Sequence, residues 1–209
     1  AVNIRGLKRM AADFAGKVPP PKCAPSTGKT VAVIGGGPGG LSAAYYLQLM
    51  GHQVTVYEML PELGGMLRYG IPNYRLPKDR LGEDIQAILD TGVQVKHGLR
   101  IGTDVTVQEL RASYDAVLIT IGASTDKKLG IEGEDAEGVM SAVRFLRDVG
   151  KGINPDLAGQ EVAIVGGGNV SMDAVRSAVR LGAKKVSILY RRRTADMTAL
   201  PAEIEGAIA

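Results

Sequence analysis

The stretch Val31-Ala32-Val33-Ile34-Gly35-Gly36-Gly37-Pro38-Gly39-Gly40 joins a short apolar run to a glycine-rich turn. Such a run is typical of a buried strand, and the residues after the turn, up to about Met50, follow a helical pattern. A second apolar run, Val54-Thr55-Val56-Tyr57, follows Gly51 and predicts a second strand. Strand, turn, helix and strand in this order form the unit that a parallel sheet requires. The sequence therefore predicts an α/β fold built on a parallel sheet.

The same pattern returns in the second half of the chain. Val162-Ala163-Ile164-Val165 leads into the turn Gly166-Gly167-Gly168-Asn169-Val170-Ser171, which precedes a helix to Leu181 and a strand at Val186-Ser187-Ile188-Leu189. We therefore expect two tandem Rossmann-like dinucleotide-binding folds. Other segments predict, in chain order, helices over 4–15 and 81–89, a strand over 93–95, a short helix after Thr106, a buried strand over 117–121 and a helix over 142–149.

The first turn has the residue types that a pyrophosphate group requires. The start of a helix attracts anions through its unpaired N–H groups and its dipole. Gly35 permits the tight bend, Gly37 leaves room for the pyrophosphate, and Gly40 lets the helix approach the strand. Pro38 suits the first helical position, where the missing N–H has no intrahelical acceptor. We thus expect the whole turn, Gly39 included, to hold the phosphates of a dinucleotide.

Glu58 ends the strand that follows this first helix. A carboxylate at this place accepts hydrogen bonds from the ribose hydroxyls of a dinucleotide. The alternative is an exposed carboxylate at a strand end without a role in binding.

The second turn differs from the first in two ways. Ser171 replaces the third glycine, and the following strand ends in Tyr190-Arg191-Arg192-Arg193 instead of an acid. A carboxylate would repel a 2′-phosphate, whereas guanidinium groups form bidentate charged hydrogen bonds with it. The sequence therefore favours NADP(H) over NAD(H) here, and a solvated basic loop is the alternative. Asn169 either caps the helix or touches the nicotinamide side, and the sequence does not separate these roles.

Composition excludes several other classes of function. The 209 residues carry a net charge of +3 with dispersed basic residues, so a nucleic-acid partner is not expected. One cysteine, Cys23, excludes an internal disulfide and an iron–sulfur cluster held within this chain. No apolar run reaches the roughly 18 residues of a membrane span, so we expect a cytoplasmic protein without a membrane partner. His52 and His97 lack the spacing of metal ligands, and no metal site is expected.

Beyond these features, much of the chain resembles the flavin-dependent small subunit of glutamate synthase and its relatives, including dihydropyrimidine dehydrogenase and ferredoxin–NADP transhydrogenases. The residues that carry the resemblance are Val31 to Glu58, Gly64-Gly65-Met66-Leu67-Arg68-Tyr69-Gly70-Ile71-Pro72-Asn73-Tyr74-Arg75-Leu76-Pro77, Tyr114 to Val117 with Gly122-Ala123, and Val162 to Pro201. The resemblance implies that the first fold binds FAD and that the second, inserted within it, binds NADPH.

The resemblance also implies individual contacts. Gly35 to Gly40 and Glu58 would hold the pyrophosphate and ribose of FAD, and Gly65, Met66 and Arg75 would line the path of the flavin. Ile101 falls where the family contacts the adenine end, and Gly122 falls where the chain closes over FAD. The NADPH contacts match the turn from Gly166 and Gly167 through Gly168 and Asn169 to Val170, together with Arg191 and Arg192.

From these features we expect an oxidoreductase that passes a hydride from NADPH to FAD and electrons onward to iron–sulfur clusters or a partner subunit. No catalytic side chain is assigned, because the cofactors carry the chemistry. The alternative is a non-catalytic nucleotide-binding module or a structural subunit fragment of a redox complex. The expected parts are an N-terminal helix and Pro-rich linker at 1–28, an FAD domain at 29–125 and an NAD(P)H domain at 126–209, with the folds incomplete at both ends. The iron–sulfur clusters would lie on other sequence or on the partner.

Overall fold

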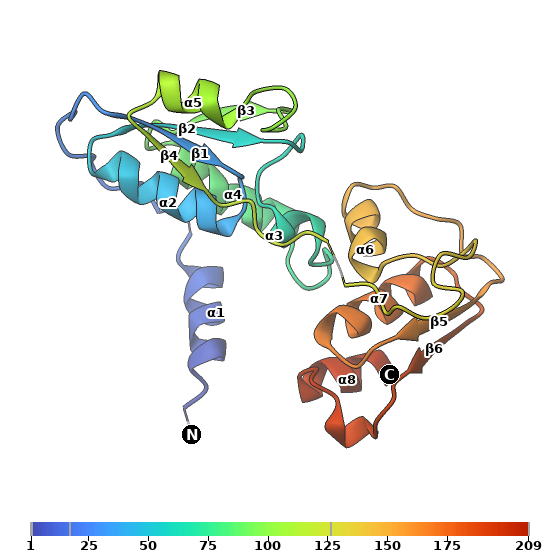
Figure 1. Ribbon diagram of the computed structural model, residues 1–209. Coiled ribbons are helices and arrows are strands. Elements are labelled where there is room, and N and C mark those ends of the chain that lie inside the picture. The colour runs from blue at the N-terminus through green and yellow to red at the C-terminus, as the bar shows by residue number, and fades with distance from the viewer. Residues whose placement is uncertain (1, 17, 126, 209) are drawn as a thin grey trace. The chain divides into compact units, whose positions relative to one another are not determined.

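The computed structural model describes residues 2–16, 18–125 and 127–208, and the chain divides into two compact units (Figure 1). The first unit comprises Ala1–Leu63 and Asp79–Ile121, and the second comprises Gly64–Lys78 and Gly122–Ala209. The short segment 64–78 therefore packs within the second unit, although it lies among first-unit residues in the sequence. This division concerns packing. The assignment of 29–125 to FAD and of 126–209 to NAD(P)H concerns ligands and stays a prediction.

The first unit is built on a four-stranded parallel sheet with the order β3-β2-β1-β4. Its strands are β1 (Thr30–Ile34), β2 (Gln53–Glu58), β3 (Gln94–His97) and β4 (Ala116–Ile119). Its helices are α1 (Ile4–Phe14), α2 (Pro38–Leu49), α4 (Lys78–Leu89) and α5 (Val107–Ser113). The expected strand–turn–helix–strand unit is thus present, and the parallel α/β class is confirmed.

Two helices cover opposite faces of this sheet (Figure 1). Leu110 of α5 packs with Ala32 and Ile34 in one buried cluster. Since side chains alternate along a strand, Val31 and Val33 face the other side, where α2 contacts β1 and β2. Burial on both faces explains why β1 is a continuous apolar run.

The second unit contains the two-stranded parallel sheet of β5 (Glu161–Val165) and β6 (Lys185–Leu189). Its helices are α3 (Met66–Tyr69), α6 (Ala142–Gly150), α7 (Asn169–Arg180) and α8 (Pro201–Ile208), with a 3₁₀ turn at Thr194–Asp196. A core of Phe145, Leu146, Ile164, Val175 and Ala178 joins α6, β5 and α7. The packing of α7 between α6 and α8 fixes the helix that follows the second glycine turn.

The expectation of a buried strand over 117–121 is wrong in extent and in burial. β4 ends at Ile119, whose side chain is 59% exposed, and Ile121 beyond it is 68% exposed. In the described part of the chain β4 pairs only with β1, so its outer edge lacks a neighbouring strand. β5 is also more exposed than its apolar run suggests, since Val165 is 60% exposed. An apolar run indicates that a strand tends to be buried. Whether the strand is buried depends on the neighbours that cover it in the fold.

Candidate nucleotide-binding sites

The first glycine turn connects the end of β1 to the start of α2 and requires glycine at its first position. Gly35 has φ +105°, and its N–H donates to the Tyr57 carbonyl of β2 at 2.8 Å. A Cβ atom at this position would lie 2.6 Å from the Thr120 carbonyl oxygen. Side chains rarely adopt this backbone conformation, and the neighbouring backbone leaves no room for one. The turn is therefore held by its two neighbouring strands as well as by its own glycines.

The start of α2 keeps its amide groups open for a ligand. Gly37 is the N-cap of α2 and carries no side chain, so it provides no side-chain acceptor for the amide groups in the first turn of the helix. Pro38 begins the helix, as expected, and a Cβ atom on Gly39 would meet open space. A Cβ atom on Gly40 would overlap the Gly35 carbonyl oxygen, which shows how closely helix and turn approach. Uncapped helix amides beside a close-packed turn form the kind of cradle that binds a phosphate.

Glu58 is buried behind the same turn. Its side chain is only 6% exposed, Oε2 accepts from Gly36 N at 2.7 Å, and Oε1 accepts from Leu60 N at 2.8 Å. The alternative of an exposed strand-end carboxylate is therefore wrong. Each carboxylate oxygen has two lone pairs, so both retain capacity for one further donor. A ribose hydroxyl fits that remaining capacity, and the contact itself stays a prediction.

The second glycine turn connects β5 to α7 with a similar backbone path. Gly166 has φ +139°, and its N–H donates to the Leu189 carbonyl of β6 at 3.0 Å. A Cβ atom on Gly166 would lie 2.5 Å from the Ser171 hydroxyl oxygen, and Ser171 is only 7% exposed. Gly168 is the N-cap, again without a side-chain cap. Serine thus fills the place of the third glycine, and the start of α7 keeps its amides open.

The two turns differ in the side chain that lies behind them. Gly35 pairs with Tyr57 and Gly166 with Leu189, so the next residues, Glu58 and Tyr190, are equivalent. Glu58 binds the amide of Gly36, whereas a Cβ atom on Gly167 would lie 2.8 Å from the Tyr190 ring. The Tyr190 hydroxyl donates to the Asp196 carbonyl at 3.0 Å. The second turn therefore has an aromatic ring where the first has a carboxylate.

Three arginines follow Tyr190, and only the third is paired among the described residues. Arg193 Nε lies 3.1 Å from Asp196 Oδ2. Arg191 and Arg192 are exposed and form no ion pair or hydrogen bond with any side chain that the structure describes. This arrangement agrees with the predicted 2′-phosphate contact and equally with the alternative of a solvated basic loop, so the contact stays a prediction.

Asn169 has a role that the sequence left open. It is the first residue of α7, and its Oδ1 accepts from Leu200 N at 2.9 Å. One residue earlier, Ala199 N donates to the Gly167 carbonyl at 3.0 Å. Asn169 therefore ties the loop before α8 to the glycine turn and does not act as the N-cap. Its neighbour Val170 is 47% exposed at the start of the helix.

The segment 64–78 is attached to α7 and α8 through Arg75. Its guanidinium lies 2.7 Å from Asp173 Oδ2 and 3.1 Å from Glu203 Oε1, and Arg176 also pairs with Glu203 at 3.0 Å. Tyr74 stacks under Arg176 and Arg180 at 4.6 and 4.1 Å from the ring centre. Sequence reasoning missed this network, because Arg75 and Asp173 lie 98 positions apart and no short motif joins them.

Asp173 is the buried centre of this network. It is 5% exposed, and its Oδ1 has no hydrogen-bond partner among the described residues. Burial raises the pKa of Asp173, and the positive charge of Arg75 acts in the opposite direction without cancelling that rise. Arg75, its ion-pair partner, and the charge of Arg176 both favour the ionised form of this carboxylate.

The other predicted contact residues lie in three places. Gly65 has φ +50° and precedes α3, whose first residue, Met66, is 39% exposed. Ile101 packs against the small core beneath α5 and forms an isolated bridge to Val105. Gly122 is exposed with φ +66°. The structure thus shows where these four residues lie, and their contacts with FAD stay predictions.

His52 and Cys23 are of types that can bind a metal, but His52 makes an ordinary hydrogen-bond contact and Cys23 faces solvent. His52 Nδ1 lies 2.7 Å from the Thr27 hydroxyl, and Cys23 is exposed. Among the described residues no group of histidine, cysteine and carboxylate side chains is arranged to hold a metal. In the same part of the chain, no helix is long and apolar enough to cross a bilayer.

Comparison with known proteins places these turns in a wider context. The sequence pattern of the pyridine nucleotide-disulphide oxidoreductase family matches residues 29–209. The chain is 44% identical to the NADP(+)-dependent formate dehydrogenase subunit beta of Moorella thermoacetica, over 98% of the chain and 32% of that protein. It is 36% identical to the glutamate synthase [NADPH] small chain of Escherichia coli, over 99% of the chain and 47% of that protein.

A solved structure of FprA from Mycobacterium tuberculosis superposes on this fold. The TM-score is 0.73 at 24% identity, covering 88% of the chain and 48% of FprA. The likeness at this identity shows the fold alone. Against its curated relatives, the chain spans between about a third and a half of their length.

Proposed function

Because the chain belongs to the pyridine nucleotide-disulphide oxidoreductase family, we propose that it binds FAD at Gly35–Gly40 and NADPH at Gly166–Ser171. When bound, FAD would supply a ring that accepts a hydride from NADPH. The chain is then part of an oxidoreductase, in which no side chain is assigned as a catalytic acid or base. Electrons would pass onward to iron–sulfur clusters or to a partner subunit.

The residues of the first turn fit a dinucleotide. The uncapped amides at the start of α2 suit a pyrophosphate, and the absence of side chains at Gly37 and Gly39 leaves space for it. Glu58 keeps the turn in shape through Gly36 N and retains acceptor capacity for ribose hydroxyls. Gly65, Met66, Arg75, Ile101 and Gly122 complete the proposed FAD contacts. Their assignment rests on the resemblance described above.

The observation that supports the proposal most directly concerns the residues that follow the second turn's strand. Arg191 and Arg192 are exposed and unpaired among the described residues, and Tyr190 stands where the first turn has Glu58. A carboxylate that would repel a 2′-phosphate is thus absent from this place, and two cations are present. The amides of Gly168 to Val170 would hold the pyrophosphate, and Arg191 and Arg192 would select NADPH over NADH.

The names of two relatives support NADPH as the nucleotide and a redox partner subunit for this chain. One is called an NADP(+)-dependent formate dehydrogenase subunit beta, and another, from Geobacter sulfurreducens, an NADPH-Fe(3+) oxidoreductase subunit beta at 43% identity over 32% of its length. Both names specify NADP and a multi-subunit assembly. We propose NADPH as the donor and a redox partner subunit for this chain on the same basis.

Titration of the full chain with NADPH and with NADH, followed by nucleotide fluorescence, tests the choice of nucleotide. The account predicts tighter binding of NADPH. Replacing both arginines, Arg191→Ala with Arg192→Ala, should weaken NADPH binding by at least about tenfold and leave NADH binding nearly unchanged, because charged hydrogen bonds contribute about 1.5–3 kcal/mol each.

Arg193→Ala is the matched control, since it removes the same charge from a neighbouring residue that is already paired with Asp196. It should alter the NADPH to NADH ratio far less. Equal binding of NADPH and NADH by the unmodified chain would contradict the assignment. The alternative of a non-catalytic nucleotide-binding module predicts the same binding results, and only the reduction of a bound flavin separates the two functions.

A further inference from the structure

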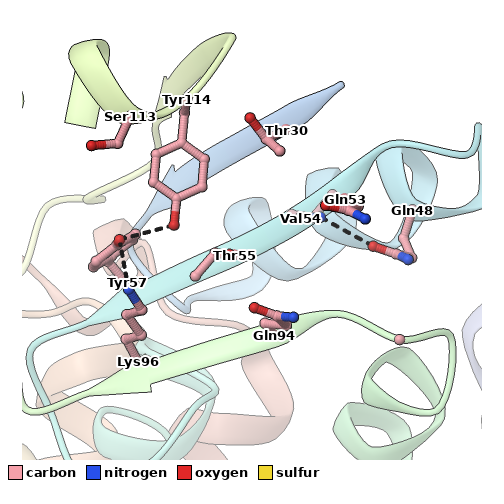
Figure 2. Close-up of a pocket in the computed structure, with 11 residues that line it drawn as sticks. Thr30, Gln48, Gln53, Val54, Thr55, Tyr57, Gln94, Lys96, Ser113 and Tyr114 are labelled. Atoms are coloured by element: carbon pink, nitrogen blue, oxygen red, sulfur yellow. Dashed lines mark hydrogen bonds between the residues drawn. The ribbon is translucent and has the colours of Figure 1, made fainter. Parts of the chain in front are cut away.

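A hollow of about 510 Å³ opens on the face of the first-unit sheet that also carries α5 (Figure 2). It is lined in part by Thr30, Gln53 and Gln94, which are the first residues of β1, β2 and β3. The glycine turn follows the other end of β1 and contributes no lining residue, although the carbonyl of Tyr57, whose side chain lines the hollow, accepts from Gly35 N. Hollows of about 300–1,000 Å³ are typical of small-molecule sites. Neither of the proposed nucleotide sites uses this one.

The lining is mostly polar and contains one charged residue. Hydroxyl groups come from Thr30, Thr55 and Ser113, and amide groups come from glutamines on β2, β3 and α2. Lys96 supplies the charge, and no carboxylate lines the hollow. Thr55, on its floor, is only 7% exposed. A wall of hydroxyls and amides around one ammonium suits a polar ligand with negative charge better than an apolar one.

Three polar groups meet at one end of the hollow. The Tyr57 and Tyr114 hydroxyl oxygens are 3.0 Å apart, and Lys96 Nζ lies 3.3 Å from the Tyr57 oxygen, as Figure 2 shows. An ammonium has three donors, and in the described part of the chain Lys96 directs one of them at this hydroxyl and has no carboxylate partner. Its remaining donors are available to a ligand.

The Tyr114 hydroxyl reports the electrostatic character of this corner. Burial alone would raise the pKa of Tyr114, but hydrogen bonds from Thr55 and Tyr57 and the charge of Lys96 outweigh burial and lower that pKa. The pKa of Tyr57, by contrast, is raised, chiefly by burial and by its hydrogen bond with Tyr114, so the surroundings stabilise a negative oxygen at Tyr114 and not at Tyr57. The same donors can serve an oxygen that a ligand brings.

We propose that this hollow binds a small anion that also carries hydroxyl groups, with Lys96 as its counter-ion. The Tyr57 and Tyr114 hydroxyls would contact the anionic group, while Thr55, Gln94 and their neighbours would contact the hydroxyl groups. A sugar acid and a sugar phosphate share this chemistry. The proposal concerns a second site on the first unit and does not depend on the nucleotide function.

Nuclear magnetic resonance of the full ¹⁵N-labelled chain tests the site residue by residue. The probes are D-gluconate, D-glucose 6-phosphate and, as the neutral polyol, sorbitol, each at constant ionic strength. The proposal predicts saturable shifts at the amides of Tyr57, Lys96 and Tyr114, with at least one anion binding at least about tenfold more tightly than sorbitol, as a charged hydrogen bond implies. A response to gluconate alone identifies a carboxylate site, and a response to glucose 6-phosphate alone identifies a phosphate site.

Lys96→Gln removes the charge and should weaken anion binding by about tenfold or more without changing the response to sorbitol. Lys22→Gln, in the exposed linker, is the matched control and should bind as the unmodified chain does. If the spectrum of Lys96→Gln shows a disturbed fold, Tyr114→Phe tests the same corner by removal of one hydroxyl. Absence of saturable binding, shifts confined to the glycine turns, or full binding by Lys96→Gln would each overturn the proposal.

Discussion

Glu58 and Tyr190 occupy equivalent positions behind two turns with similar backbones. In the first turn the carboxylate holds the amide of Gly36, and in the second the aromatic ring lies against Gly167. The exchange removes an acid from the place where a ribose would lie, and Arg191 follows directly in the sequence. We therefore propose that the residue at the end of the strand, together with Arg191 and Arg192 behind the second turn, favours a different nucleotide at each turn.

The strict need for glycine at position 35 gives a stability prediction. Gly35→Ala places a Cβ atom 2.6 Å from the Thr120 carbonyl at φ +105°, so we expect it to lower the free energy of unfolding by about 3 kcal/mol. Gly39→Ala, where a Cβ meets open space in a helix, should stay within about 1 kcal/mol of the unmodified chain. Urea unfolding of both variants measures the difference. Equal stability of the two would show that this turn is not held as described.

The Asp115 carboxylate gives a prediction for acid pH. Hydrogen bonds from Lys29 and from the Thr30 amide and hydroxyl lower the pKa of Asp115 from 3.8 to about 2. Because the folded pKa lies below the ordinary value, the contribution to stability is present above about pH 4 and is lost as the pH falls toward 2. A ¹³C carboxyl titration should show this low pKa, and Lys29→Gln should raise it. An ordinary pKa in the unmodified chain would contradict the contacts.

At the level of elements, the segment 64–78 is joined to α7 by charged and aromatic contacts. Arg75 binds Asp173 on α7 and Glu203 on α8, and Tyr74 stacks under Arg176. The same α7 begins at the second glycine turn, and Asn169 ties that turn to the loop before α8. The position of the helix start therefore depends on side chains that lie outside the turn.

Arg75→Ala tests the importance of this network for stability. The change removes the ion-pair partner of the buried Asp173 carboxylate and leaves it only the charge of Arg176, which forms no ion pair with it, so the free energy of unfolding should fall by about 3 kcal/mol in urea titrations at neutral pH. Burial already raises the pKa of Asp173, so the loss should become smaller in acid, where the protonated group has no charge to bury.

The combined variant Arg75→Met with Asp173→Leu is the control for this effect. It removes both partners and should recover most of the lost stability, since paired removal of buried polar groups is often nearly neutral. A loss from Arg75→Ala that does not depend on pH, or a double variant as unstable as the single one, would show that the ion pair is not the cause.

Most elements could be predicted from the sequence because their signals are local. The glycine turns correctly indicated α2 and α7, and the short helix expected after Thr106 is α5, whose first turn Thr106 caps by accepting from Glu109 N at 3.1 Å. The four-residue α3 was missed, because so short a helix has no periodicity to detect. The exposure of β4 and the contacts of Arg75 depend on partners distant in sequence. The packing of distant segments decides such contacts, and the local patterns of a single sequence do not show which segments pack together.

At the level of the whole molecule, two α/β units each present one uncapped helix start at a glycine turn. Each unit has its own core, and each turn is held by contacts within its own unit. The family match covers 29–209 and thus both turns. One turn is backed by the Glu58 carboxylate and the other by the Tyr190 ring, which two unpaired arginines of the described chain follow, and these surroundings suit two different dinucleotides. We therefore propose that the chain binds FAD at the first turn and NADPH at the second.

Anaerobic titration of the FAD-loaded full chain with NADPH, followed by flavin absorbance, tests this claim most directly. We expect the yellow colour to be lost on addition of NADPH, NADH to act only at higher concentration, and Arg191→Ala with Arg192→Ala to reduce the NADPH response. The contradicting result is an FAD-loaded chain that binds NADPH yet keeps its oxidised flavin spectrum, which would make the chain a nucleotide-binding module and not an oxidoreductase.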